Sequence, residues 1–371
     1  MTRARQPLVD ALKVLAAQCI VWHHLSAYGP LSDALWTQAP ALADALYDHA
    51  RKAVQVFLVV GGFLAAGTLL RPTDGRLLRT AVLQRYRRLV PPFLVAMALA
   101  AGMATLLRPW LSDDLRLQSA TPGTWLAHAL LLHDIVEVPA IAAGAWYVAI
   151  DFQLYALVAG LAWIATQLAP APRRNVLALA LLIGCIAVSL LHVNRHPDLD
   201  LWALYFIGSY GLGVLAAQAV RGPRWPWSMA IVAIGAAALA VEWRDRIALS
   251  LGVAVLLAGW ARPGTPGSAS TDPASFAPRS QASGAASKWA RGWAARLTAA
   301  VAAGMATGAD RSYALFLTHY SAVLVGNAAL ARWPALAAHA WALATACWAA
   351  SLLLAWAFER AVERPLARRL R

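Results

Sequence analysis

The chain has 371 residues, of which 60% are hydrophobic and 13% charged, and its formal net charge is +14. A soluble domain usually carries about a quarter charged residues, so this composition argues against an ordinary soluble enzyme and favours a protein that lies in a lipid bilayer. The positive excess does not indicate nucleic-acid binding, because Lys and Arg lie between apolar stretches rather than along one face.

The first apolar stretch follows Arg3 and Arg5 and imitates a signal peptide. Ionisable residues, among them Lys13, His23 and His24, interrupt this stretch. The apolar core of a cleaved signal does not normally tolerate such residues. We therefore interpret the stretch as a retained first helix.

Hydropathy predicts an all-α fold, a polytopic membrane bundle of about ten transmembrane helices that forms one domain over residues 1–371. The predicted spans are 8–28, 53–70, 89–107, 145–168, 175–192, 201–219, 226–241, 246–261, 312–330 and 337–358.

Charge predicts the orientation of this bundle. With the N-terminus inside, the cytoplasmic segments hold 23 of the 32 Lys and Arg residues. The opposite side holds eight of them, and Lys13 lies within a span. This bias places both termini in the cytoplasm. The eight residues on the outer side are Arg51, Lys52, Arg108, Arg116, Arg195, Arg244, Arg246 and Arg332.

Two further segments do not fit the pattern of spans. The apolar stretch 124–142 is interrupted by His128 and His133 and by two acidic residues, so we expect a re-entrant or interfacial segment. Residues 262–296 are rich in Gly, Ser, Ala and Pro, which predicts a flexible cytoplasmic loop. The three cysteines lie far apart inside apolar segments, so we expect neither a disulfide nor a metal site.

Ionisable groups inside a span cost about 2.5–3.5 kcal/mol each, so each is a candidate functional residue. Lys13 and His24 are eleven residues apart, which leaves them about 20° out of register on one helix face and about 16 Å apart along the axis. His23 should face elsewhere. Asp10 can pair with Lys13. Alternatively, Asp10 and Lys13 only reach the cytoplasmic interface, and His24 lies among the outer headgroups.

These residues belong to a set of motifs that resembles the acyltransferase 3 family of integral membrane O-acyltransferases over nearly the whole chain. The family signature is an Asp-x-x-Arg/Lys followed after ten residues by His, here Asp10, Lys13 and His24. The other similar motifs, in chain order, are QVFLVVGGFL at 55–64, RYRRLVP at 85–91, WYVAIDFQLY at 146–155, and Ser312-Tyr313 with His319 followed by Glu363-Arg364-Pro365. The sequence departs from the family motifs at three positions: Lys13 stands where Arg is commoner, Gly61 where the family has Ser, and Asp151 where it has Glu.

The resemblance implies that an acyl group, most simply acetyl, passes from acyl-CoA to a hydroxyl of a cell-envelope or exported glycan or a lipid-linked sugar. Acyl-CoA would be a donor substrate and not a permanently bound cofactor. The expected location is the bacterial cytoplasmic (inner) membrane, with membrane lipid around the protein and no nucleic-acid partner.

The candidate residues fit this task. Lys13, with Arg85, Arg87 and Arg88 on the adjoining cytoplasmic loop, would hold the phosphates of coenzyme A. The pantetheine arm would then run along the bundle towards His24, the expected general base. Arg87 and Arg88 are also explained as determinants of orientation.

The fourth predicted span adds a second polar stripe. Tyr147, Asp151 and Tyr155 recur every four residues and share a helix face. Asp151 would orient His24 or stabilise its protonated form; alternatively, it forms a structural pair with an Arg or Lys of the bundle. Gln153 lies off that face and would contact the donor or pack. His319 would line the same cavity, or be a packed, hydrogen-bonded residue.

Glu363-Arg364-Pro365 is interpreted as a helix stop at the cytoplasmic interface.

Other classes of protein carry buried charges as well. A transporter or flippase of a lipid-linked glycan would line its path with the same groups, whereas the register of Lys13 and His24 and the ordered motifs favour the enzyme. A receptor or scaffold is disfavoured because the loops are short.

Overall fold

The structure is a computed structural model, and it describes residues 6–69, 74–117, 120–260 and 285–369. These residues form helices joined by turns, with no strand among them, so the predicted all-α fold is confirmed for the described chain. The main helices are α1 (Pro7–Leu25), α2 (Gly29–Gln38), α3 (Pro40–Asp48), α4 (Val54–Leu69), α5 (Gly75–Leu107), α6 (Pro122–Ala129), α7 (Ala145–Leu168), α8 (Arg174–Leu191), α9 (Ala203–Arg221), α10 (Arg224–Val241), α11 (Asp245–Gly259), α12 (Ala285–Arg332), α13 (Ala340–Phe358) and α14 (Arg364–Arg369).

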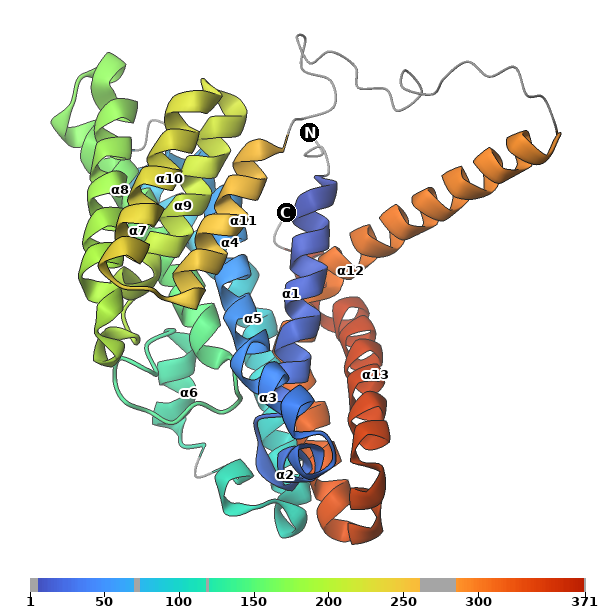
Figure 1. The fold of residues 1–371 in the computed structure, drawn as a ribbon. Helices are drawn as coiled ribbons and strands as arrows, with labels where there is room; N and C mark the ends of the chain where they lie inside the picture. The colour runs from blue at the N-terminus through green and yellow to red at the C-terminus, as the bar shows by residue number, and fades with distance from the viewer. Residues whose placement is uncertain (1–5, 70–73, 118–119, 261–284, 370–371) are drawn as a thin grey trace.

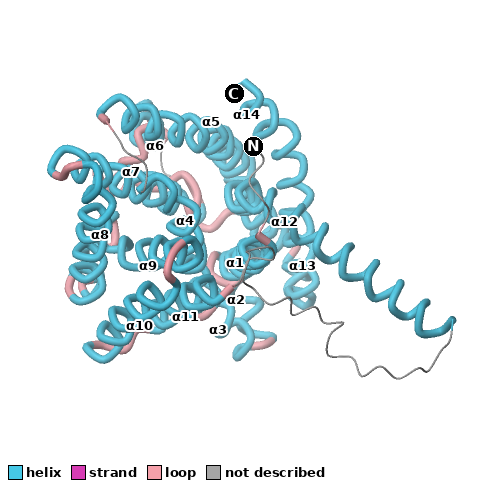
Figure 2. Tube along the Cα trace, turned by 90° about the horizontal axis from the view of Figure 1, so that it is seen from above, coloured by secondary structure: helices cyan, strands magenta, loops and turns pink. Residues whose placement is uncertain are grey.

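Helix α9 is the core of one half of the bundle. Every residue from Tyr205 to Ala219 is buried, and α4, α8, α10 and α11 pack around the helix (Figure 2). A helix that is apolar on all sides is suited to this position because it leaves no face that requires water.

Glycines allow α4 and α9 to approach closely. A Cβ atom built on Gly62 would lie 1.8 Å from the carbonyl oxygen of Tyr210, and one on Gly213 would lie 1.9 Å from the carbonyl oxygen of Val59. Small residues of this kind let membrane helices gain van der Waals contact between their backbones. The α4–α9 contact joins segments that lie far apart in the sequence.

The other half of the bundle is built on α12, which packs against α1, α5 and α13. Helix α1 also contacts α4, so the first helix lies between the two halves (Figure 2). The candidate residues of α1 therefore face helices from both halves.

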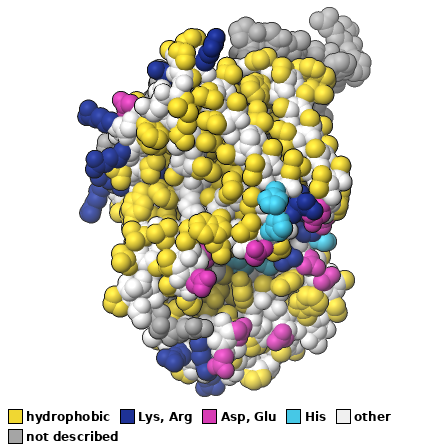
Figure 3. Space-filling view, turned by 90° about the vertical axis from the view of Figure 1, so that its left-hand side faces the viewer, with side chains coloured by type: hydrophobic (Ala, Val, Ile, Leu, Met, Phe, Trp, Pro, Cys, Tyr) yellow, Lys and Arg dark blue, Asp and Glu magenta, His cyan; other side chains and the backbone are white. Residues whose placement is uncertain are grey.

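Nine helical segments of the described chain are long and apolar enough to cross a membrane. We expected ten spans, and the remaining one, 246–261, is helix α11, whose 15 residues fall short of the roughly 20 needed for a full crossing. The side of the molecule drawn in Figure 3 is covered mainly by apolar side chains, as a surface in contact with lipid requires.

Helix α1 begins and α14 ends at the same end of the bundle, opposite α2, α3 and α6 (Figure 1). This arrangement is compatible with both termini on one side of a membrane, which requires that the short helix α11 also carries the chain from one side to the other. Which side that is stays a prediction from the charge bias.

Two segments that the sequence predicts to be non-helical, a loop and a helix end, are helical in the structure. The expected loop 71–88 is helix from Gly75 onward, because α5 begins with Asp74 as its N-cap and runs without interruption to Leu107. The stop expected at 363–365 is also wrong: after α13 the chain continues through a π-helical turn, Glu359–Glu363, into α14. The loop expected at 262–296 lies largely outside the described residues, and α12 begins at Ala285.

The segment 124–142 consists of α6 and a series of turns. His128 and His133 are fully buried, and their rings stack with centroids 4.2 Å apart. Burial lowers the pKa of each to about 4, so both are neutral near pH 7. The histidines that interrupt the apolar sequence therefore bring no charge into the packed segment.

The α4–α9 contact leads to a stability prediction. Gly213→Ala should lower the thermal unfolding midpoint of the purified protein, because the added methyl group must push apart two backbones, and such overpacking costs about 1–3 kcal/mol. Gly102→Ala is the matched control, since nothing lies within 4 Å of its Cβ position. Equal midpoints for the two variants would contradict the close contact.

Candidate functional site

Two cavities enter the bundle from different directions, and the ring of Phe316 lines both of them. The larger cavity has a volume of about 720 Å³ and is lined by His23, His24 and Trp146, among others. The smaller has a volume of about 360 Å³ and is lined by Lys13, Arg85 and further residues. We call them the histidine cavity and the cationic cavity. Lys13 and His24 thus open into different cavities. Their spacing predicted different depths on one helix face but not two separate cavities.

His24 is buried and interacts with a second histidine. Its Nδ1 lies 2.6 Å from Nε2 of His319 on α12, and the two rings stack with centroids 4.8 Å apart. The other ring nitrogen of His319, Nδ1, lies 3.0 Å from the carbonyl oxygen of Leu315. His319 is fully buried and lines neither cavity, so it is the packed, hydrogen-bonded residue that the sequence left open as the alternative. The sequence did not reveal its contact with His24.

The hydrogen-bond partners determine the tautomers. A carbonyl oxygen can only accept, so Nδ1 of His319 carries the proton that it donates to Leu315. With a neutral ring, Nε2 of His319 is then an acceptor, and Nδ1 of His24 must donate to it. Nε2 of His24 is consequently the nitrogen that is able to take up a proton.

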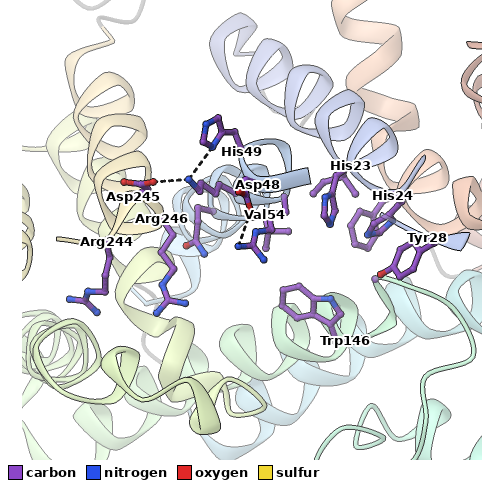
Figure 4. A pocket seen from close by; sticks show the side chains of 16 residues that line it. His23, His24, Tyr28, Asp48, His49, Val54, Trp146, Arg244, Asp245 and Arg246 are labelled. Carbon is purple, nitrogen blue, oxygen red and sulfur yellow. Dashed lines mark hydrogen bonds and ion pairs between the residues drawn. The ribbon is translucent and has the colours of Figure 1, made fainter. Parts of the chain in front are cut away.

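His23 also lines the histidine cavity, contrary to the expectation that it would face elsewhere. The centre of its ring lies 5.2 Å from that of His24, and Figure 4 shows the two side chains next to each other. The ring of Tyr47 on α3 lies 5.7 Å from that of His23. The rotation of about 100° between neighbours on a helix is real, but the cavity is wide enough to include both side chains.

The cationic cavity brings together three of the four expected phosphate ligands. Lys13, Arg85 and Arg88 line it, and Arg87 does not. Because residues 85–88 belong to helix α5 and not to a loop, Arg85 and Arg88 are one turn apart on one side, and Arg87 is directed away. Nζ of Lys13 donates to the carbonyl oxygen of Ala309 at 2.8 Å.

Asp151 forms an ion pair with Arg85. Both side chains are largely buried, with 10% of the carboxylate side chain exposed, and the Arg85 guanidinium also lies 5.3 Å from the ring centre of Tyr155. The orienting contact expected between Asp151 and His24 is not among the hydrogen bonds of the described residues, since His319 occupies Nδ1 of His24. Asp151 therefore belongs to the cationic cavity, where its carboxylate balances the charge of the buried Arg85.

The remaining candidates have distinct positions. Tyr147 lines the cationic cavity, whereas the hydroxyl of Tyr155 accepts a hydrogen bond from Thr68 at 3.4 Å. Gln153 donates to the carbonyl oxygen of Leu131, whose φ of 57° is unusual for a side-chain-bearing residue, so it supports that turn and does not line either cavity. Asp10 is partly buried on α1, one turn before Lys13.

Three aromatic rings separate the cavities. The ring of Phe316 lies 5.1 Å from Tyr147 and 6.1 Å from Phe57, and Tyr147 lies 5.9 Å from Phe57. Gly144, with φ +86°, starts α7 beside this cluster, where an added Cβ would lie 3.2 Å from Phe316 and 3.9 Å from His24. The aromatic partition, Phe57, Tyr147 and Phe316, is thus packed directly against the histidine pair.

Sequence reasoning did not identify the polar residues opposite His24. The histidine cavity is also lined by Arg51, Lys52, Gln55, Arg244 and Arg246. A usable signal was present, because four of these five belong to the eight Lys and Arg residues that the charge count assigns to the outer side.

A family model described as an acyltransferase domain matches residues 7–360, nearly the whole chain. Among curated proteins, the regulator of hypoxia-inducible factor 1 of Caenorhabditis elegans is 27% identical over an alignment of 171 positions that covers 41% of this chain. The match covers 33% of that protein, so the chain spans about a third of its length. No solved structure matches the chain.

The Arg85–Asp151 pair leads to a second stability prediction. Asp151→Asn should lower the unfolding midpoint markedly, because removing one partner of a buried pair costs about 3–5 kcal/mol. The double variant Arg85→Gln/Asp151→Asn should lose less than the two single variants added together, as residues in direct contact require. Arg87→Gln, an exposed neighbour, serves as the control. Strict additivity in a double-mutant cycle would show that the pair does not stabilise the fold.

Proposed function

The chain belongs to the acyltransferase 3 family, and from that premise we propose that it transfers an acyl group, acetyl in the simplest case, from acyl-CoA to a hydroxyl of a cell-envelope or exported glycan or a lipid-linked sugar. The proposed location is a bacterial cytoplasmic membrane. The observation that carries the proposal is the position of His24, whose proton-accepting nitrogen is defined by His319 and which lies beside an aromatic partition that adjoins a cationic cavity.

The cationic cavity suits the donor. Coenzyme A carries phosphate groups at one end of a narrow arm. Lys13 and Arg88 share the wall of the cavity with the acidic residues Asp310 and Glu363, and they are the side chains there that can donate to phosphate oxygens. The charge of Arg85 is balanced by Asp151, so we assign to Arg85 the shaping of the wall more than phosphate neutralisation. The arm would then extend to Phe316, where the thioester approaches the histidine cavity.

The histidine cavity suits the acceptor. Its volume lies within the range of about 300–1,000 Å³ usual for small-molecule sites, and Trp146 offers a flat aromatic face on which the apolar side of a sugar ring can pack. A hydroxyl of the acceptor would be placed at Nε2 of His24.

The chemistry follows from these positions. Nε2 of His24 removes the proton of the acceptor hydroxyl as its oxygen attacks the carbonyl carbon of the thioester. The carbon–sulfur bond then breaks, the acyl group remains on the acceptor oxygen, and the proton passes from His24 to the thiolate of coenzyme A. His24 ends in its initial state, ready for another cycle.

His319 is proposed as a positioning residue. Its neutral Nε2 accepts from Nδ1 of His24, which keeps the reactive nitrogen of His24 unprotonated before the reaction and stabilises the imidazolium that forms during it. A carboxylate has this function in many catalytic triads. A neutral histidine gives a weaker effect but places no further charge in the membrane.

The transfer reaction gives the main test. Membranes that contain the protein should label a glycan or lipid-linked sugar when they are supplied with radiolabelled acetyl-CoA and an extract of native envelope. His24→Ala should reduce labelling by about 10²-fold or more, the usual contribution of a general base. His339→Ala is the control, because His339 is exposed and lines neither cavity. Equal labelling by both variants would remove His24 from the reaction, and a transporter would show no dependence on acetyl-CoA.

The donor side requires a defined orientation. Alkaline phosphatase fused after residue 38, at the end of α2, should be active, because this end of the bundle carries few Lys and Arg residues and is predicted to face outward. Fusion after residue 285, at the start of α12, should be inactive. The reverse result would place the cationic cavity on the side that lacks acyl-CoA.

A further inference from the structure

The histidine cavity has an excess of positive charge. Four cationic side chains and two carboxylates line it, and its histidines add no charge when neutral. The charged residues lie across the cavity from the catalytic side: Figure 4 shows Arg244, Asp245 and Arg246 on one side and His23, His24 and Tyr28 on the other.

Two of the four cations are neutralised by neighbours. Nζ of Lys52 lies 2.7 Å from a carboxylate oxygen of Asp245, and Arg51 lies 3.6 Å from Asp48. The hydrogen bond from Lys52 lowers the pKa of Asp245, so this carboxylate is ionised near pH 7. Both acidic residues of the lining are therefore already paired.

Arg244 and Arg246 supply the excess charge. Neither forms an ion pair with any residue that the structure describes. Arg244 is only 8% exposed and donates to Asn194 Oδ1 at 2.8 Å and to the carbonyl oxygen of Leu190 at 2.7 Å. These acceptors are neutral dipoles, so they satisfy hydrogen bonds without cancelling the charge.

Arg246 is the better placed of the two to contact a ligand. Its Nη2 donates to the carbonyl oxygen of Asn194 at 2.8 Å, and its guanidinium lies 5.0 Å from the ring centre of Tyr205. These two contacts orient the guanidinium while it remains partly exposed in the lining of the cavity. A planar guanidinium held in this way is suited to phosphate or carboxylate.

The position of these arginines is unusual for the chain as a whole. Only eight of the 32 Lys and Arg residues fall on this side of the bundle, and four of those eight line this one cavity. The bias that orients the chain therefore does not account for them. A structural role explains most of the contacts of Arg244, but among the described residues no carboxylate lies within ion-pair distance of Arg246. Glu242, an exposed carboxylate near both arginines, forms its ion pair with Arg195.

We propose that the acceptor carries an anionic group, a phosphate or a carboxylate, which Arg246 contacts and Arg244 attracts while the reacting hydroxyl lies at His24. This inference rests on the proposed acyl transfer and specifies its substrate class. The anion provides the missing counterion, and its binding across the cavity sets which hydroxyl reaches the histidine. A neutral sugar of the same size would leave the two arginines uncompensated and would bind less tightly.

The first test measures the charge of the product. Native envelope extract is incubated with radiolabelled acetyl-CoA and the wild-type protein, and the labelled product is applied to an anion-exchange resin at neutral pH. An acetyl ester is uncharged, so retention on the resin reports a charge of the acceptor. Butanol extraction of the same product distinguishes a lipid-linked phosphate from a water-soluble anionic glycan.

The second test measures the contribution of Arg246. Arg246→Gln should raise the apparent acceptor KM about tenfold or more with little change in kcat, because the lost contact is a charge-assisted one remote from the reacting atoms. Arg246→Lys should retain part of the affinity. Arg332→Gln is the control, since Arg332 is exposed on the same side and does not line the cavity.

A third measurement does not depend on any variant. Inorganic pyrophosphate should inhibit the wild-type protein competitively against the acceptor when acetyl-CoA is saturating, so that the cationic cavity is already occupied.

Labelled product in the flow-through of the resin, or an unchanged KM for Arg246→Gln, would overturn the anionic acceptor and leave the acyl transfer standing. Absence of any His24-dependent labelling would instead overturn the proposed function itself.

Discussion

The contact between His24 and His319 connects most of the features of this molecule. It joins the first helix to α12, and its hydrogen bond, 2.6 Å long, is possible only because each histidine has a defined tautomer. Leu315, one turn earlier on α12, sets that tautomer by accepting from His319. Phe316 follows Leu315 directly and closes the space between the two cavities. One turn of α12 therefore positions the base and also separates the two sides of the site.

The charged residues are distributed according to the cost of burial. Arg85 lies deep in the bundle and is paired with Asp151, because an unpaired buried charge would cost several kcal/mol. Arg244 is just as buried but is surrounded by neutral oxygen acceptors. The first arrangement cancels charge, and the second keeps it available to the cavity. This difference, and not the number of arginines, distinguishes a structural cation from one that can attract a ligand.

The sequence predicted the fold class, the helix that carries the site and the register of Lys13 and His24, because hydropathy and helix periodicity are local properties. It did not predict which side chain meets His24, since His319 is 295 residues away and its contact depends on the packing of α12 against α1. For the same reason the sequence left the partner of Asp151 open between His24 and an Arg or Lys of the bundle, and the packing selects Arg85. Periodicity gives the face of a helix but not what that face touches. The basic segment before Pro91 was expected as a loop, yet Asp74 caps α5 and the helix extends through it.

In the proposed reaction, the aromatic partition would stand between a water-soluble donor in the cationic cavity and an acceptor in the histidine cavity. Phe57, Tyr147 and Phe316 come from three helices and meet edge to face or tilted, with ring centres 5.1–6.1 Å apart. Such packing does not depend on polar contacts between the rings, so a displacement of the rings breaks no hydrogen bond between them. A thin acyl arm needs only a displacement of these rings to bring its thioester to His24. An acceptor bound in the histidine cavity would displace water from the surroundings of His24, which favours transfer to the bound hydroxyl over hydrolysis of the donor.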